Sequence, residues 1–434
     1  MSERRERTNE PRSVWEGLVG PHVLVLNSGS SSIKYRLLDM GAGRRVAEGV
    51  VERIGEGTSA LTHEIEGADE PYTRDEAYAD HEAGLRAVLA AFAAAGPDLA
   101  RIGLAAVGHR VVHGGDRYGD PVLIDDTVEK AIADLAPLAP LHNPVNLTCI
   151  KVARQAFPRL PHVAVFDTAF HQTLPAVAHT YAVPREWATE LGVRRYGFHG
   201  ISNAYVSRRA AELLGKPYDQ VNTIVLHLGN GASATAVEGG RSVDTSMGLT
   251  PLEGLVMGTR SGDLDPALPA FLSRVKGMRI DEIDDALNAR SGLLGLAGAN
   301  DLREVWRLVD AGDSDAALAL EVYCHRIRKY VGAYYAVLQA ASGHVDAVVF
   351  TAGVGENDPR TRARALSGLE RLGISVDAAR NEIQVRTTRS EGRAPRGGGH
   401  VISPDGTEVA VLVIPTDEEF EIATESLAIV TPPP

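Results

Sequence analysis

The sequence predicts an α/β protein built from two similar halves, and two glycine-containing turns carry that prediction. The first turn, residues 27–34, reads NSGSSSIK and follows the apolar run 23–26. The second turn, residues 229–233, reads GNGAS and follows the apolar run 223–228. A short apolar run that ends in small polar residues is typical of a buried strand and a tight turn. Each turn leads into another strand-like segment, so one hairpin layout occurs twice, roughly half a chain apart.

The first half continues with a helix and two strands. Apolar residues at helical spacing between 85 and 95, with Gly96 just beyond them, predict the helix. Residues 104–107 and 162–166 are short apolar runs that predict strands, and they are followed by GHRVVHGG and DTAFH. Because ligands gather at the carboxyl ends of strands in open α/β sheets, we expect both motifs to face a binding site.

The second half repeats this alternation. An apolar face predicts a long helix over residues 315–341, and apolar runs predict strands at 347–350 and 409–414. These strands are followed by TAGVGEN and PTDEE. Residues 386–400 contain four arginines and three consecutive glycines, which indicates a flexible surface loop. Residues 420–430 have a helix-like pattern.

Composition and charge favour an enzyme of two domains. The chain has 434 residues, which is too long for one ordinary core. Its net charge of −13 disfavours nucleic-acid and anionic-membrane partners, which require a basic face. Cys149 and Cys324 lack the spacing of a metal site and fit a reducing compartment. Residues 1–20 are expected to be a disordered extension without a signal peptide's apolar core, so we expect a cytoplasmic protein without a membrane span.

The first turn has the parts of a phosphate-binding loop. Gly29 allows close backbone approach, the serines that follow supply hydroxyls, and Lys34 supplies a positive charge. The spacing is not that of a P-loop, and a plain hairpin turn explains this segment equally well. The second, similar turn favours phosphate binding, because opposed glycine-rich hairpins around a nucleotide are the plan of the actin-like ATPases. That step is an analogy of fold.

Ten motifs make the chain similar to the acetate kinases. In order along the chain they are NSGSSSIK, GHRVVHGG, LHNP, FDTAFH, YGFHG, HLGNG, DTSMGLTPLEG, RSGDLDP, TAGVGEN and PTDEE. The resemblance implies an α/β fold of two duplicated actin-like (ribonuclease H-like) domains, with the active site in the cleft between them. It also implies reversible, direct in-line transfer of the γ-phosphoryl group of ATP to acetate, giving acetyl phosphate and ADP. The alternatives are a propionate or butyrate kinase of the same family and a non-catalytic actin-like ATPase.

The resemblance also implies a division of the chain. The first domain would comprise residues 21–169, with residues 420–434 packing back on it. The second domain, residues 170–419, would bind the nucleotide and form a homodimer.

The same resemblance assigns four catalytic residues. Arg110 and Arg260 would contact the acid's carboxylate and the transferring phosphoryl group, for which the planar guanidinium is well suited. His199 would stabilise the transition state by hydrogen bonding. Asp167 is the family's catalytic aspartate. Because acetate is already an anion at neutral pH, we expect Asp167 to orient an arginine or hold a metal-bound water rather than to act as a base.

Substrate, metal and nucleotide positions also follow from the resemblance. Together with Arg110, an apolar pocket around the acid's methyl group would comprise Val112, Leu141, Phe198 and Pro251. Mg²⁺, or Mn²⁺ in its place, would be held at Asn27 and Glu418. His142 and His227 would make supporting contacts. The nucleotide would be held by Lys34, His227, Leu228, Gly229, Asn230, Gly231, Asp301, Leu302, Arg303, Gly353, Val354, Gly355, Glu356 and Asn357.

Overall fold

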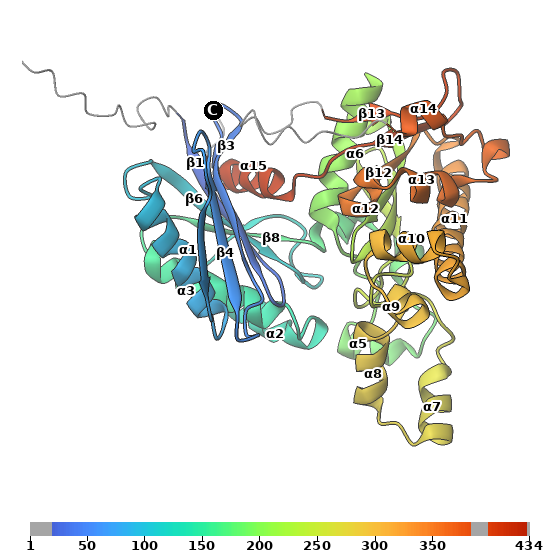
Figure 1. The fold of residues 1–434 in the computed structure, drawn as a ribbon, viewed down its shortest axis with the longest axis horizontal. Helices are drawn as coiled ribbons and strands as arrows, with labels where there is room; N and C mark the ends of the chain where they lie inside the picture. The colour runs from blue at the N-terminus through green and yellow to red at the C-terminus, as the bar shows by residue number, and fades with distance from the viewer. Residues whose placement is uncertain (1–19, 383–397, 432–434) are drawn as a thin grey trace, which may run out of the picture.

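Two mixed β-sheets, each accompanied by helices, make up the protein (Figure 1). The computed structural model describes residues 20–382 and 398–431. The expectations for the N-terminal extension before residue 20 and for most of the 386–400 loop lie outside these described residues. Within them, no helix is both long enough and apolar enough to cross a membrane.

The first sheet has eight strands in the order β5-β4-β3-β2-β1-β6-β8-β7. Its strands are β1 (His22–Ser28), β2 (Ile33–Asp39), β3 (Arg44–Glu52), β4 (Ser59–Ile65), β5 (Tyr72–Glu76), β6 (Leu104–Val111), β7 (Val122–Leu123) and β8 (His162–Phe166). The second sheet has six strands in the order β11-β10-β9-β12-β14-β13. They are β9 (Asn222–Leu228), β10 (Ala232–Glu238), β11 (Arg241–Thr245), β12 (Ala347–Thr351), β13 (His400–Val401) and β14 (Ala410–Val413).

The α-helices of the described residues fall into two sets. Accompanying the first sheet in sequence are α1 (His81–Ala95), α2 (Asp126–Asp134) and α3 (Asn143–Ala156). After β8 follow α4 (Ala176–His179), α5 (Arg185–Leu191), α6 (Gly200–Leu214), α7 (Leu268–Lys276), α8 (Ile280–Ala289), α9 (Gly292–Ala297), α10 (Leu302–Asp310), α11 (Ser314–Ser342), α12 (Ala352–Asn357), α13 (Pro359–Leu366), α14 (Ala378–Asn381) and α15 (Glu418–Val430).

The two sheets share one pattern of pairing. In the first, β1 pairs antiparallel with β2 and parallel with β6, which in turn pairs parallel with β8. In the second, β9 pairs antiparallel with β10 and parallel with β12, which pairs parallel with β14. The central strands β1 and β9 are buried along their whole length, as strands covered on both faces should be. The predicted α/β fold with two duplicated halves is therefore confirmed.

Both predicted turns close the hairpins that the sequence indicates. Gly29 donates its N–H to the Ser32 carbonyl at 2.8 Å, between β1 and β2. Gly229 donates to the Gly231 carbonyl at 3.0 Å, between β9 and β10. The two turns thus occupy equivalent places in the two sheets.

Two segments differ from the sequence-based expectation. Strand β6 extends to Val111, so Arg110 lies on a strand rather than in the loop after it. The glycine-containing segment after β12 forms the short helix α12, although glycine disfavours helix. Ala352, at φ 64°, makes the abrupt change from strand to helix.

Helix α15 returns to the first sheet, where it contacts β1, β6 and β8 (Figure 1). It begins at Glu418 because the Asp417 side chain caps it, accepting from the Phe420 N–H at 3.1 Å. A Cβ on Gly108 of β6 would lie 2.6 Å from the Ser426 Oγ, so only glycine permits this close approach. The start of α15 consequently lies beside the ends of β1 and β6.

Candidate functional site

Arg110 and Asp167 form an ion pair at the carboxyl ends of two neighbouring strands. Arg110 lies near the end of β6, and Asp167 directly follows β8. The Arg110 Nε lies 3.0 Å from Asp167 Oδ1, and its Nη2 lies 2.6 Å from Oδ2. The Arg110 Nη1 also donates to the Asn27 Oδ1 at 3.0 Å. Asp167 is 1 % exposed, so its carboxylate depends on Arg110 for compensation of its charge.

Acidic residues at the start of α15 face this ion pair. The Asn27 Nδ2 donates to Glu419 Oε1 at 3.1 Å, which links β1 to α15. Burial raises the pKa of Glu418 to about 7; Arg110 opposes the rise, whereas Asp167 and Glu419 add to it. Glu419 was absent from the residues expected at the site, although it is adjacent to Glu418 in PTDEE.

The residues expected to bind a divalent metal fit that role in their chemistry. Besides burial, the charges of Asp167 and Glu419 raise the pKa of Glu418, and a cation there would offset that repulsion. The Asn27 Oδ1 already accepts from Arg110. Within the described part of the chain, no group of three or more His, Cys, Asp or Glu side chains could hold a metal on its own. Mg²⁺ commonly takes one or two protein carboxylates and completes its shell with phosphate and water.

Two stacked histidines lie on the other side of the site. The rings of His199 and His227 have centroids 4.0 Å apart and are inclined by 18°. The Nδ1 atoms hydrogen-bond Ser233 Oγ and Ser202 Oγ respectively, each at 2.9 Å. Burial lowers the pKa of both histidines, that of His227 to about 3, and Arg110 adds to the effect. Both imidazoles are therefore neutral at physiological pH and can donate hydrogen bonds without carrying charge.

Arg260 is a half-buried cation in a different electrostatic setting. Its Nη1 donates to the Pro251 carbonyl at 3.3 Å and approaches the Met257 sulfur at 3.8 Å. Throughout residues 20–382 and 398–431, no carboxylate forms an ion pair with it, and burial lowers its pKa. A Cβ on Gly231 would lie 3.6 Å from both the Arg260 Nη1 and the His199 Nε2. The second glycine turn, Arg260 and His199 thus converge on one place.

His142 connects the two arginines electrostatically. It precedes α3, and its pKa is lowered to about 4 by burial, by Arg260 and by Arg110. Both guanidinium groups therefore lie within electrostatic range of the same imidazole.

The residues expected around the acid's methyl group differ in burial. Val112 and Phe198 are 5 % and 2 % exposed and belong to the same apolar cluster. Pro251 is half-buried, and its carbonyl accepts from Arg260. Leu141 is 64 % exposed and takes no part in that cluster. The structure therefore brings three of these four residues close to the site's buried part and leaves Leu141 at the surface.

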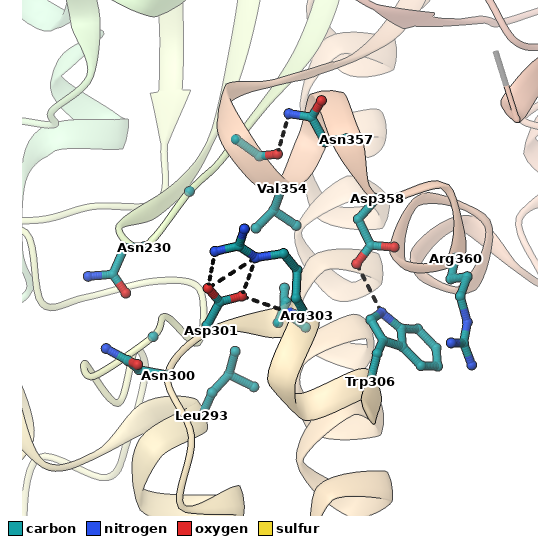
Figure 2. Close-up of a pocket in the computed structure, with 14 residues that line it drawn as sticks. Asn230, Leu293, Asn300, Asp301, Arg303, Trp306, Val354, Asn357, Asp358 and Arg360 are labelled. Atoms are coloured by element: carbon teal, nitrogen blue, oxygen red, sulfur yellow. Dashed lines mark hydrogen bonds and ion pairs between the residues drawn. The ribbon is translucent and has the colours of Figure 1, made fainter. Parts of the chain in front are cut away.

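A cavity of about 760 Å³ lies in the second half (Figure 2). Of the fourteen residues expected to hold the nucleotide, eight line it: Gly229, Asn230, Asp301, Leu302, Arg303, Gly353, Val354 and Asn357. Six others line it that the sequence interpretation missed: Gly258, Leu293, Asn300, Trp306, Asp358 and Arg360. The lining is mixed apolar and polar, as is usual for a small-molecule site.

Helix α10 forms one wall of this cavity (Figure 2). Asp301 caps the helix by accepting from the Arg303 N–H at 2.9 Å, and its carboxylate also pairs with the Arg303 side chain. One turn further on, the Trp306 Nε1 donates to Asp358 Oδ2 at 2.9 Å. The Arg360 guanidinium covers the indole, 3.7 Å from the ring centroid. Trp306 could have been identified from sequence, since it lies four residues after Leu302 on the same helix face.

The remaining expected nucleotide residues lie outside the cavity lining. Lys34 is exposed on β2, directly opposite Asn27. His227 and Leu228 end β9, and Gly231 lies within the second turn near Arg260. Gly355 and Glu356 lie on α12, where Glu356 Oε1 accepts from the Thr416 N–H at 3.1 Å and burial raises its pKa.

Comparisons with known proteins give a consistent result. The model of the acetokinase family matches residues 22–424. A curated acetate kinase of Streptomyces coelicolor is 57% identical over 410 residues, covering 94% of this chain and 97% of its own. The crystal structure of Porphyromonas gingivalis acetate kinase superposes with a TM-score of 0.84 at 42% identity, covering 95% of this chain and 100% of its own. That of a propionate kinase from Francisella tularensis gives 0.84 at 39% identity, covering 94% and 100%.

Proposed function

The chain belongs to the acetokinase family, and on that premise we propose how it phosphorylates acetate. The γ-phosphoryl group of ATP passes by direct in-line transfer to the acid, giving acetyl phosphate and ADP, and the reaction runs in both directions. The observation that carries this proposal is the setting of Arg260. It is a half-buried cation without an ion-pair partner in the described structure, beside a neutral histidine and a glycine turn. Such a cation is matched by an anionic ligand.

The two arginines have different parts in this mechanism. Arg260 binds the acid's carboxylate and then the charge that spreads over the transferring phosphoryl group. Arg110 acts from the opposite side, and its orientation is fixed by its two-point contact with Asp167. That contact supports an orienting role for Asp167, because acetate has no proton for a base to remove.

The histidines contribute hydrogen bonds without adding charge. The His199 Nδ1 is engaged by Ser233, which leaves the Nε2 edge toward Arg260 and Gly231. A neutral imidazole there can donate to an oxygen of the phosphoryl group as negative charge develops on it. His227, stacked beneath His199, limits the ring's rotation.

The metal and the nucleotide complete the proposed site. Glu418, and Asn27 after release of its contact with Arg110, would hold Mg²⁺, which supplies charge neutralisation between the phosphates. The cavity of Figure 2 would take the adenosine, with Trp306 and Val354 as apolar walls. Lys34 and the turn after β9 would lie toward the phosphates.

The acid-binding pocket is small. Phe198 and Pro251 are rigid, and Val112 is buried beside Phe198. Closure of the site would be needed to bring the exposed Leu141 against the methyl group. A longer acid is the second candidate substrate, because the propionate kinase superposes as well as the acetate kinase does.

We also propose an oligomeric state and a cellular location for the protein. Large apolar side chains are exposed on α4, α5 and α7 of the second half, among them Val177, Trp187, Leu191, Phe271 and Val275. Exposed apolar side chains are common at subunit interfaces, and the homodimer that the family resemblance implies would be detected by analytical ultracentrifugation. Cys149 and Cys324 are both free and buried, which supports a cytoplasmic location.

One assay tests the proposed function. Acetate, ATP and Mg²⁺ are incubated with the protein, and hydroxylamine traps any acyl phosphate as a coloured hydroxamate. We expect hydroxamate from acetate, less from propionate and little from butyrate. Release of free phosphate without hydroxamate would instead indicate an actin-like ATPase that transfers nothing to an acid.

A further inference from the structure

The segment that carries Arg260 has no regular structure of its own. It connects β11, which ends at Thr245, to α7, which begins at Leu268, and every residue between them is described. A connection of this length needs external contacts to hold one conformation. The position of the Arg260 side chain consequently depends on whatever fixes this segment.

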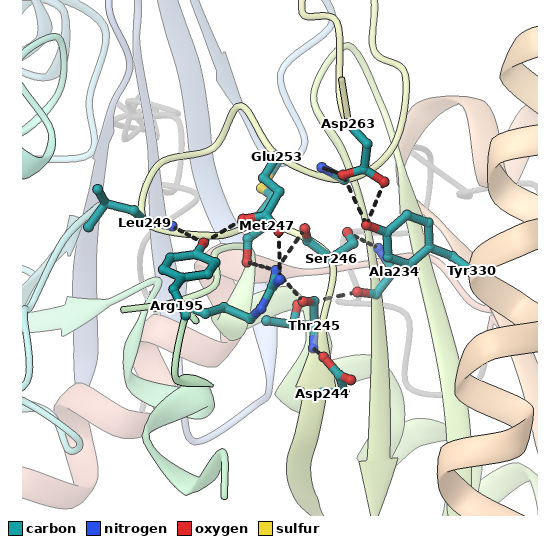
Figure 3. A network of polar contacts seen from close by, with 12 residues as sticks. Arg195, Ala234, Asp244, Thr245, Ser246, Met247, Leu249, Glu253, Asp263 and Tyr330 are labelled. Carbon is teal, nitrogen blue, oxygen red and sulfur yellow. Dashed lines mark hydrogen bonds and ion pairs between the residues drawn. The ribbon is translucent and has the colours of Figure 1, made fainter. Parts of the chain in front are cut away.

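Arg195 fixes the first part of the segment (Figure 3). Its Nη1 donates to the carbonyls of Thr245, Ser246 and Met247 at 2.9, 3.0 and 3.1 Å. Its Nη2 pairs with Glu253 Oε1 at 2.6 Å. This places the chain on either side of Pro251, whose carbonyl accepts from Arg260.

Asp263 fixes the second part by closing a loop around Arg260. The Asp263 N–H donates to the Gly254 carbonyl at 3.0 Å, and the Gly254 N–H donates to Asp263 Oδ1 at 2.9 Å. Residues 254 and 263 are thereby joined twice. Gly262 between them has φ 66°, and a Cβ there would lie 2.3 Å from the Leu255 carbonyl oxygen, so the loop leaves no room for a side chain at this point.

Helix α11 supports the base of this loop. The Tyr330 hydroxyl donates to Asp263 Oδ2 at 2.9 Å (Figure 3), and Arg326 donates to the Gly254 carbonyl at 2.8 Å. Burial, together with the neighbouring Asp263, raises the pKa of Tyr330, which keeps the hydroxyl protonated as a donor. Residues of α11 such as Ile327, Val331 and Tyr334 are buried in the main apolar cluster, so the helix offers a rigid support.

We infer that Tyr330 and Asp263 are positioning residues, which hold the loop from Gly254 to Asp263 so that Arg260 meets the acid and the phosphoryl group. Neither residue touches the reactants. The inference rests on the role proposed for Arg260, and it makes the contact between α11 and the loop part of the catalytic arrangement.

Tyr330→Phe tests this with a change of one hydroxyl. The ring and its contact with Tyr334 remain, so the fold should be retained. We expect kcat/KM for acetate to fall about tenfold, the effect of one lost hydrogen bond to a charged group, with KM for ATP changed by less than about twofold. Tyr335→Phe on the same helix is the matched control, because the Tyr335 hydroxyl contacts Gln339 and not the loop. It should leave both constants unchanged.

A double-mutant cycle then separates positioning from a general structural effect. If Tyr330 acts through Arg260, Tyr330→Phe should have less than about a twofold further effect in an Arg260→Ala background. Asp263→Asn, which still accepts from the Gly254 N–H, should retain more activity than Asp263→Ala. Rescue by the conservative variant would support the inference.

Three results would overturn it. Tyr330→Phe with wild-type constants would show that the contact has no catalytic consequence. Equal losses of kcat/KM in the wild-type and Arg260→Ala backgrounds would show a structural role. If the wild-type protein itself yields no hydroxamate, the proposed function fails first, and the inference fails with it.

Discussion

Arg110→Ala and Arg260→Ala should each nearly abolish turnover, but only Arg110→Ala should also destabilise the fold. Arg110 compensates a carboxylate, since Asp167 is 1 % exposed and forms its ion pair with Arg110. Arg260 forms no ion pair in the described structure, and burial of its charge lowers its pKa. The two side chains therefore contribute differently to the free energy of unfolding.

The magnitudes follow from these surroundings. Arg110→Ala leaves Asp167 as a buried charge without compensation, which costs about 3–5 kcal/mol of stability. This corresponds to a decrease in Tm on the order of 10 °C. Arg260→Ala removes a half-buried cation that has no ion-pair partner among the described residues, so the stability should stay within about 1 kcal/mol of the wild type. Both variants should lose about 10²-fold or more in kcat, because each arginine acts on charge in the transition state.

The assay combines hydroxamate kinetics with thermal denaturation of the same preparations. Arg159→Ala, a change at an exposed arginine, serves as the control and should alter neither measurement. Near-normal kcat in either variant would remove that arginine from the mechanism. An unchanged Tm for Arg110→Ala would refute the argument from the burial of Asp167, whatever the activity.

Three further changes test other parts of the site. Glu418→Gln should raise the Mg²⁺ concentration needed for half-maximal activity. Glu425→Gln on the same helix is the control and should not change it. If Glu418→Gln and the wild type have the same Mg²⁺ dependence, Glu418 is not a ligand. Val112→Ala should reduce the ratio of kcat/KM for acetate to kcat/KM for propionate, chiefly by lowering KM for propionate. One methylene group in an apolar pocket changes such a ratio by about 10- to 200-fold. Burial beside Glu421 raises the pKa of Glu425 from 4.5 to about 7. Between pH 4.5 and about 7, the carboxyl of Glu425 is therefore protonated in the native state and ionised in the unfolded state. The free energy of unfolding consequently falls as the pH rises through this range. Glu425→Gln should abolish that loss and be more stable than the wild type by up to about 3 kcal/mol at pH 8, with no difference below pH 4.5 in urea denaturation.

The order of strands and helices could be predicted because most elements are short apolar runs or have helical periodicity. The strand at 162–166 and the long helix from 315 agree with β8 and α11 to within one residue. Segment 353–357 could not be predicted as helix, because its glycines indicate a turn and the packing of α12 against β9 and β12 decides otherwise.

The sequence indicated part of the residues of the candidate site but not how they are arranged. Motifs in the sequence indicated Arg110 and Asp167 separately. Their pairing depends on β6 and β8 being neighbours, which the order along the chain does not reveal. The sequence around Arg260 has no periodicity, so its support by Asp263 and Tyr330 follows only from tertiary contacts. The place of Trp306 at the cavity could have been predicted from its spacing on α10. Its stacking with Arg360 is known only from the structure.

The position of α15 has a consequence for how the protein is synthesised. The ribosome synthesises this helix after every other helix and strand of the described residues, yet its side chains Ile422 and Ala423 pack among Val23, Val25 and Val165 of the earlier strands β1 and β8. Until α15 emerges, that face of the first sheet lacks its cover and exposes apolar surface, which favours aggregation or chaperone binding. The same late helix carries Glu418, so the covering of the first sheet and the assembly of the proposed metal-binding residues happen in one step. A truncated chain that ends before α15 would lack both this cover of the first sheet and Glu418.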